Sequence, residues 1–255
     1  MVKNNKFIKT ITAAAFWIFV WEAASLLVPE SLSMFLPGPF SVFGTFIKML
    51  PQTTYWKGVG ATLIRIFSGL VLGTFTGFVF GILTSTVKVF DLLLSPALKT
   101  VRAVPVVSFI ILAFLFISVD YLPVFISLLM VSPLIWQAVH DGITGTDRKL
   151  CEMAKVYHVK PIKLLFNIKL PAASDRIVSA AVSAVGLAWK SGVAAEVLCT
   201  PAISIGKNIY RAKGTLNFNE VYALTLTVVI LSLLFEFAVK FFWNKYKKSE
   251  VRRDA

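Results

Sequence analysis

The sequence has 255 residues, of which 57% are hydrophobic and 15% charged, and its formal net charge is +13. This composition is too apolar for an ordinary soluble domain and predicts an integral membrane protein. The positive charge does not indicate a nucleic-acid partner, because the Lys and Arg residues cluster in the intervals that a membrane topology places in the cytoplasm.

The chain opens with a basic stretch that is followed by an apolar segment. Residues 11–28 are expected to form the first membrane span, and they include Glu22 and four large aromatic side chains. A cleaved signal peptide is the rival interpretation, because it also combines a basic start with an apolar stretch. Glu22 and the aromatic residues favour a retained span. Beyond it, apolar residues between Val42 and Leu50 predict a short amphipathic helix at the outer interface.

The second span is expected at residues 61–87, which carry no charge from Ile66 onward. At a rise of about 1.5 Å per residue, such a segment easily crosses roughly 30 Å of hydrocarbon. Glycines recur there at every fourth position and form one stripe along the helix: Gly69, Gly73, Gly77 and Gly81. Such a stripe lets a second helix approach closely. We expect that contact within the chain, with a subunit interface as the alternative.

Four further apolar segments predict an all-α integral membrane domain of six spans over residues 1–255. These segments cover residues 103–119, 122–140, 175–199 and 221–243. The interval from Lys88 to Arg102 is expected in the cytoplasm, Asp120–Tyr121 in a tight outer turn, and Thr200 to Glu220 outside. In this topology eighteen Lys and Arg residues lie in inner intervals and five in outer ones. Such a bias predicts a multi-pass membrane protein with both termini in the cytoplasm.

The loop at residues 145–171, between spans four and five, has two predicted short helices. Its apolar residues at helical spacing form one stripe, and Asp147 is a suitable N-cap for that helix. The stripe consists of Leu150, Met153, Ala154 and Tyr157. Pro161 suits the first turn of the second helix, and Pro171 is expected to end it. Two short helices joined by a bend make a compact knob that is suited to fill a groove on a partner.

The same loop resembles the EAA loop of the membrane subunits of ABC importers. That motif reads E-A-A, three residues, G, nine residues, I, one residue, L-P. All of these spacings recur in the chain, at Glu152, Met153, Ala154, His158, Ile168, Leu170 and Pro171. Met153 replaces an Ala, and His158 replaces the Gly. The Gly of the motif allows a sharp turn with positive φ, a conformation that His adopts at some cost. The alternative interpretation is a merely basic cytoplasmic loop.

Three further segments are similar to the nitrate, sulfonate and taurine branch of these permeases. They are residues 36–40 (LPGPF), 102–105 (RAVP) and 188–196 (AWKSGVAAE). The resemblance implies docking of the 147–171 loop on ABC ATPase subunits, which would bind ATP and magnesium in place of this chain. It further implies a second permease subunit, commonly an identical one, and an extracellular substrate-binding protein. The chain itself is then not an enzyme, and its substrate is expected to be a small organic anion or related nutrient.

Ionisable side chains within a span are costly in lipid, so each is a candidate for function. The fifth span offers Lys190 and Glu196, whose spacing of six positions places them on different faces of a helix. The side chains expected to line a translocation path are Ser179, Ser183, Trp189, Lys190 and Glu196. For Lys190, a buried structural pair is an equally good interpretation.

Other classes of membrane protein lack support in the sequence. A secondary transporter would need inverted repeats or coupling-ion residues, and a channel would need a filter sequence. A membrane enzyme would need a clustered catalytic set, whereas the chain has two histidines and two widely separated cysteines without metal-ligand spacing. A secondary transporter or a channel without an ATPase partner remains the alternative to an importer subunit.

Overall fold

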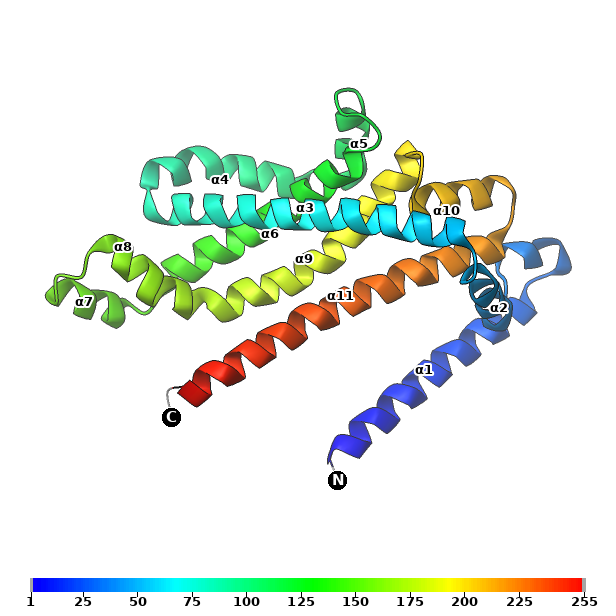
Figure 1. The fold of residues 1–255 in the computed structure, drawn as a ribbon, viewed down its shortest axis with the longest axis horizontal. Coiled ribbons are helices and arrows are strands. Elements are labelled where there is room, and N and C mark those ends of the chain that lie inside the picture. Colours follow the sequence, from blue (N-terminus) through cyan, green and yellow to red (C-terminus); the bar gives the residue numbers. More distant parts are fainter. Residues whose placement is uncertain (1, 254–255) are drawn as a thin grey trace.

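The computed structural model describes residues 2–253, with side chains described for residues 9, 12–29 and 31–245. All regular structure in this part of the chain is helical, as the sequence predicts (Figure 1). The helices are α1 (Val2–Leu27), η1 (Glu30–Phe35), α2 (Pro39–Met49), α3 (Thr53–Thr86), α4 (Lys88–Ala103), α5 (Val106–Phe114), α6 (Leu122–Thr144), α7 (Arg148–Val156), α8 (Pro161–Leu164), η2 (Leu165–Lys169), α9 (Leu170–Cys199), α10 (Ile205–Gly214) and α11 (Phe218–Arg253).

The core of the bundle is the packing of α3 against α6 and of α6 against α9. All four glycines of the predicted stripe lie in α3 and are buried, and a Cβ built on each would collide with α6. At Gly77 such a Cβ would lie 2.5 Å from the carbonyl oxygen of Ser132 and 2.9 Å from Cβ of Ile135. The glycine stripe therefore makes a contact within the chain.

Four helices are long and apolar enough to cross a membrane by themselves: α3, α6, the continuous helix from Pro161 to Cys199, and α11. The pair α4–α5 passes the same test only as one bent element. The apolar part of α1, from Thr12 to Leu27, is shorter. The structure thus has four or five apolar spans, and six would require both the bent pair and α1 to cross.

The third predicted span differs from the structure. Within residues 103–119 the structure has α5, whose nine residues extend only about 13 Å at the helical rise. The preceding interval, expected as a cytoplasmic connection, is the 16-residue helix α4 packed along α3. Pro105 cannot continue the α4 hydrogen bonds and holds Val104 in extended backbone, so the chain bends by 101° between α4 and α5.

Pro171 does not end the helix before it, contrary to the sequence-based expectation. The chain stays helical from α8 through the π-helical turn η2 into α9. In that turn the amide of Leu170 donates to the carbonyl of Leu165, five residues earlier. The wider turn accommodates the proline directly after it, so α8 and α9 form one continuous helix.

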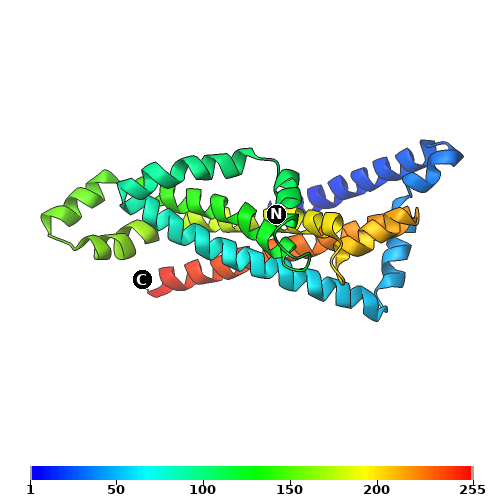
Figure 2. The same cartoon turned by 90° about the horizontal axis from the view of Figure 1, so that it is seen from above.

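The two ends of the bundle carry different elements (Figures 1 and 2). At one end lie the α3–α4 junction, α7, α8 and the C-terminal end of α11. At the other end lie α2, α10 and the loop between α9 and α10. The predicted amphipathic helix near Val42 is α2, whose buried residues are Val42 and Met49. The helix α1 extends away from the bundle and approaches it through α2 and through Trp21, which contacts Tyr222 of α11.

Candidate functional site

The helix α7 stands at one end of the molecule and is stabilised locally by its own cap. The side chain of Asp147 accepts a hydrogen bond of 2.9 Å from the amide of Lys149, as expected for an N-cap. Glu152 forms an exposed ion pair with Arg148 one turn earlier, at 2.8 Å. These contacts lie within the helix, so α7 does not need the bundle to fix its shape.

The outward face of α7 is apolar and exposed in the described part of the chain. Leu150, Met153 and Tyr157 expose 41%, 50% and 75% of their surface, and Val156 is equally exposed. Ala154, which the sequence analysis placed in the same stripe, is buried and faces inward. Its small side chain lets α7 lie close to the rest of the knob. The surface formed by Leu150, Met153, Val156 and Tyr157 is named here the α7 apolar face.

His158 occupies the bend with φ 50°, in the left-handed region that the family glycine position requires. Its amide donates to the carbonyl of Lys155 at 3.0 Å, and the amide of Val159 donates to Ala154 at 2.9 Å. This pair of bonds is the Schellman ending of a helix, in which glycine is the usual residue at the position of His158. The histidine therefore preserves the bend that the motif predicts.

The remaining motif residues connect the knob to the bundle. Ile168 and Leu170 are partly buried, and Leu170 packs against the main core together with the buried Leu165. Leu165 and Leu170 therefore join the turn η2 to the core, and α8 continues through that turn into α9 without a break.

The five predicted path residues fall on two different sides of α9. Ser179, Ser183 and Lys190 are exposed along one face. Trp189 is buried against Phe235 of α11, with ring centroids 5.9 Å apart, and Glu196 is fully buried. The structure thus brings together only three of the five, and these three form what is named here the α9 polar face.

Hydrogen bonding leaves the α9 polar face open to a ligand. The hydroxyls of Ser179 and Ser183 each donate to a carbonyl of the preceding turn, to Asp175 and Ser179 respectively, and keep their acceptor capacity. Lys190 forms no ion pair with any residue whose side chain the structure describes. The buried structural pair considered for Lys190 is therefore not formed among the residues whose side chains the structure describes.

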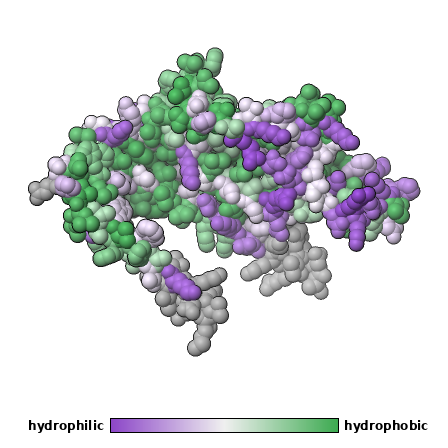
Figure 3. All heavy atoms as spheres, turned by 180° about the vertical axis from the view of Figure 1, so that it is seen from behind, coloured by the Kyte–Doolittle hydropathy of each residue, from purple (hydrophilic) through white to green (hydrophobic). Residues whose placement is uncertain are grey.

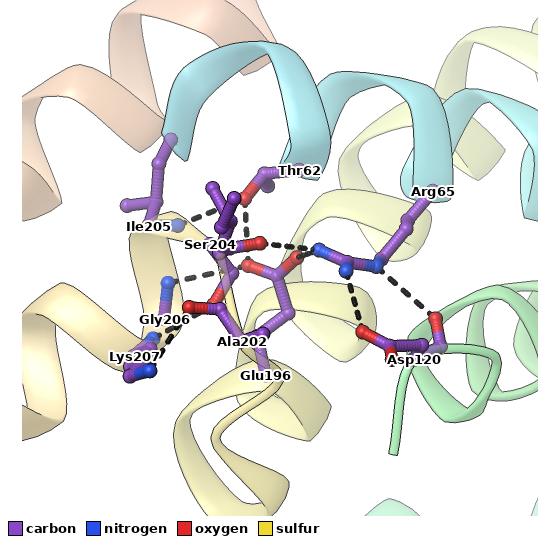
Figure 4. Close-up of polar contacts among 10 residues, drawn as sticks. Thr62, Arg65, Asp120, Glu196, Ala202, Ser204, Ile205, Gly206 and Lys207 are labelled. Carbon is purple, nitrogen blue, oxygen red and sulfur yellow. Dashed lines mark hydrogen bonds and ion pairs between the residues drawn. The ribbon is translucent and has the colours of Figure 1, made fainter. Parts of the chain in front are cut away.

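Glu196 instead belongs to a polar cluster at the opposite end of the bundle from α7 (Figure 4). Its Oε2 accepts hydrogen bonds from the hydroxyl of Thr62 at 2.8 Å and from the amide of Gly206 at 3.2 Å. Its Oε1 lies 3.5 Å from Nη1 of Arg65. The first turn of α10, with Ser204 as its N-cap, thus presents a free amide to a buried carboxylate.

Arg65 ties two connecting segments to α3 in the same cluster. Its guanidinium donates to the carboxylate of Asp120 at 2.9 Å and to the carbonyl of Ile203 at 2.7 Å. A Cβ on Gly206 would collide with Cβ of Glu196, so α10 can approach α9 only with glycine there. The sequence pattern did not single out Arg65 as a functional residue. The signal that could have identified Arg65 is its spacing from Thr62: the two residues lie one helical turn apart and therefore face the same neighbour.

Known proteins share both the sequence pattern and the fold. A family model for the binding-protein-dependent transport system inner membrane component matches residues 69–248. The putative aliphatic sulfonates transport permease protein SsuC of Bacillus subtilis (strain 168) is 27% identical over 249 residues, covering 96% of this chain and 89% of that protein. The bicarbonate transport system permease protein CmpB of Synechocystis is 24% identical over 190 residues, covering 73% of this chain and 67% of that protein.

Two solved structures have a similar arrangement of helices. The crystal structure of an amino acid ABC transporter with histidines aligns with a TM-score of 0.65 at 16% identity, covering 80% of this chain and 98% of that one. The inward-facing MetNI methionine ABC transporter aligns with a TM-score of 0.58 at 18% identity, covering 73% and 91%. At these identities the likeness establishes the fold alone.

Proposed function

Because this chain belongs to the family of binding-protein-dependent transport system inner membrane components, we propose that it conducts a small anion across the cell membrane and is driven by ABC ATPase subunits docked on α7. ATP and magnesium would be bound by those partners. An extracellular binding protein would deliver the substrate to the end that carries α10. The chain itself is a transport component and not an enzyme.

The observation that carries this proposal is the α7 apolar face. Leu150, Met153 and Tyr157 are exposed at the tip of a capped helix that projects beyond the bundle. Exposed apolar side chains on a rigid helix are the recurring anchors of helix-in-groove recognition. The continuous helix from Pro161 to Cys199 then carries a movement of that anchor into the bundle. A partner that changes shape with ATP can thereby shift the populations of the outward-open and inward-open states.

The α9 polar face supports a path between two copies of the chain. Lys190 is exposed in the C-terminal half of a long apolar helix, where contact with lipid is costly. A second, identical permease subunit opposite this face would enclose a polar route with a cation on each side. An anionic substrate fits such a route, and the named relatives are permeases for aliphatic sulfonates and for bicarbonate.

Sidedness follows from the distribution of charge in the proposed topology. The end with α7 and α8 carries Arg148, Lys149, Lys155, Lys160, Lys163 and Lys169. This end is proposed to face the cytoplasm, together with both chain termini. The side chains of Lys3, Lys6, Lys247, Lys248, Arg252 and Arg253, which contribute to the same bias in the sequence, lie outside the described residues.

Replacing Met153 by Glu tests the docking. An exposed side chain can accept this change with little effect on the fold, roughly within 0.5 kcal/mol, whereas a charge in an apolar interface is strongly unfavourable. We expect Met153→Glu to weaken association with the co-expressed ATPase by about tenfold or more, a loss of roughly 1.4 kcal/mol. Copurification of the ATPase and substrate-stimulated ATP hydrolysis in proteoliposomes provide the measurements.

Met34→Glu is the matched control, because Met34 has a similar exposure of 44% but lies in η1 at the opposite end. It should leave ATPase association unchanged. Unchanged association and hydrolysis in Met153→Glu would exclude α7 as the docking element, and loss of association in both variants would point to a general defect in folding.

A further inference from the structure

The helices α9 and α11 diverge towards the end of the bundle that carries α7, and a groove opens between them (Figure 1). Its volume is about 530 Å³. One wall is formed by Val178, Ser179 and Val182 of α9, and the other by Lys240, Trp243 and Asn244 of α11. Lys240 and Asn244 also line a second, adjoining groove of about 540 Å³ along α11, beside Phe237 and Phe241.

Polarity in both grooves increases towards the end of the bundle. The helices run in opposite directions, so Val182 and Phe237 lie deeper than Ser179 and Asn244 respectively. Lys240 and Asn244 are one helical turn apart and therefore share one face of α11. Apolar walls that end in an ammonium and an amide match a molecule with hydrocarbon chains and a polar headgroup.

The charge available in the grooves is positive. Lys240 keeps donors free, because its only ion pair among the described residues is a long contact of 3.8 Å with Glu236, and its side chain is 57% exposed. Lys245 adds a second cation to the outer groove. The one carboxylate in the lining, Asp175, already interacts within the chain.

We propose that these grooves bind a phospholipid with an anionic headgroup from the cytoplasmic leaflet. Its phosphate is held by Lys240 and Asn244, and its acyl chains lie along Val178 and Val182 and along Phe237 and Phe241. Basic pockets between membrane helices on the cytoplasmic side are typical sites for such headgroups. Assignment to this leaflet rests on the proposed topology. A bound lipid here would fill the space between the knob-bearing helix and α11.

Seen from behind, the molecule carries hydrophilic side chains only over parts of its surface (Figure 3). They gather over the end with α7 and α8 and in a broken strip across otherwise apolar helices. Exposed apolar side chains cover much of the described surface, whereas the two grooves also carry Lys240, Asn244 and Lys245.

The test uses the full chain, purified with its ATPase in nanodiscs that contain a photoactivatable phosphatidylglycerol. We expect crosslinks to concentrate on residues 178–182 and 237–245. In native mass spectrometry, Lys240→Ala should lower the affinity for phosphatidylglycerol roughly fivefold, while Lys240→Arg should retain it. Lys213→Ala, which removes an exposed cation of α10, is the control and should change nothing.

Three results would overturn the proposal. Crosslinks spread evenly over α3, α5 and α11, with no effect of Lys240→Ala, would indicate ordinary annular lipid. If glycerol phosphate, added at the same concentration as the lipid, prevented the crosslinking, the grooves would be a site for a soluble anion. Disulfide formation between two copies carrying Phe241→Cys, without bound phosphatidylglycerol, would show that a second copy covers the groove. Transport activity is not needed for any of these measurements, so failure of the proposed function would not mimic them.

Discussion

Glu196 and Lys190 lie six positions apart on α9, and their surroundings are opposite. The carboxylate of Glu196 is fully buried among Thr62, Arg65 and the amide of Gly206. Removing a carboxylate from water is costly, and only several simultaneous partners offset that cost. Lys190 has no such partners and remains exposed. The same helix therefore carries one charge that stabilises the fold and one that is free to meet a substrate.

We predict that Glu196→Ala destabilises the protein by about 3 kcal/mol, because it leaves Arg65 and Thr62 without their buried partner. The estimate lies at the low end for a broken buried pair, since Arg65 retains Asp120 and the carbonyl of Ile203. Unfolding by sodium dodecyl sulfate in mixed micelles measures the difference. Lys190→Ala is the control on the same helix: it should unfold like the unmodified chain but reduce anion uptake. Equal stability of the two variants would contradict this assignment.

At the scale of elements, the contact between α3 and α6 depends on the absence of side chains. A Cβ at Gly77 would lie 2.5 Å from a backbone oxygen of α6, which cannot move without its helix. By contrast, Gly60 on the same helix has no atom within 4 Å of an added Cβ. Since van der Waals packing is the main attraction between helices in lipid, separating this pair removes much of the core.

Gly77→Leu should therefore destabilise the fold by at least 1–3 kcal/mol, the usual cost of overpacking. Gly60→Leu should be neutral or stabilising by about 0.5–1 kcal/mol, because it removes a flexible residue from a helix. Assembly yield and denaturation in mixed micelles compare the two. If Gly77→Leu matched Gly60→Leu in stability, the close approach of α3 and α6 would not contribute to the fold.

Local patterns in the sequence predict most elements but not their long-range partners. The four-residue glycine repeat, the cap at Asp147 and the bend at His158 depend on residues close in sequence, and the structure agrees with each of them. The π turn before Pro171 differs from the expected helix end, because proline both breaks helices and is accommodated within them. Glu196 was assigned to a path because its partner Arg65 lies 131 positions away, where no spacing rule reaches.

For the whole molecule, the two ends of the bundle have distinct chemistry and distinct proposed partners. The end with α7 has the apolar face, six basic residues and the cationic grooves. The other end has α10 and the Arg65 cluster, in which two outer segments are tied to α3. A protein that couples ATP hydrolysis on one side to substrate delivery on the other requires this polarity, so sidedness is the property on which the proposed function depends most.

Cysteine labelling measures that sidedness directly. Lys160, in the bend before α8, and Gln52, directly before α3, are both exposed and lie at opposite ends of the bundle. In a background without Cys151 and Cys199, which are both free thiols, Lys160→Cys should react with a membrane-impermeant maleimide only in inverted vesicles. Gln52→Cys should react only in intact cells, because a charged reagent does not cross the hydrocarbon core. The two positions serve as controls for each other, since leaky vesicles would label both. Labelling of Lys160→Cys from outside would reverse the topology and remove α7 from the reach of any cytoplasmic ATPase.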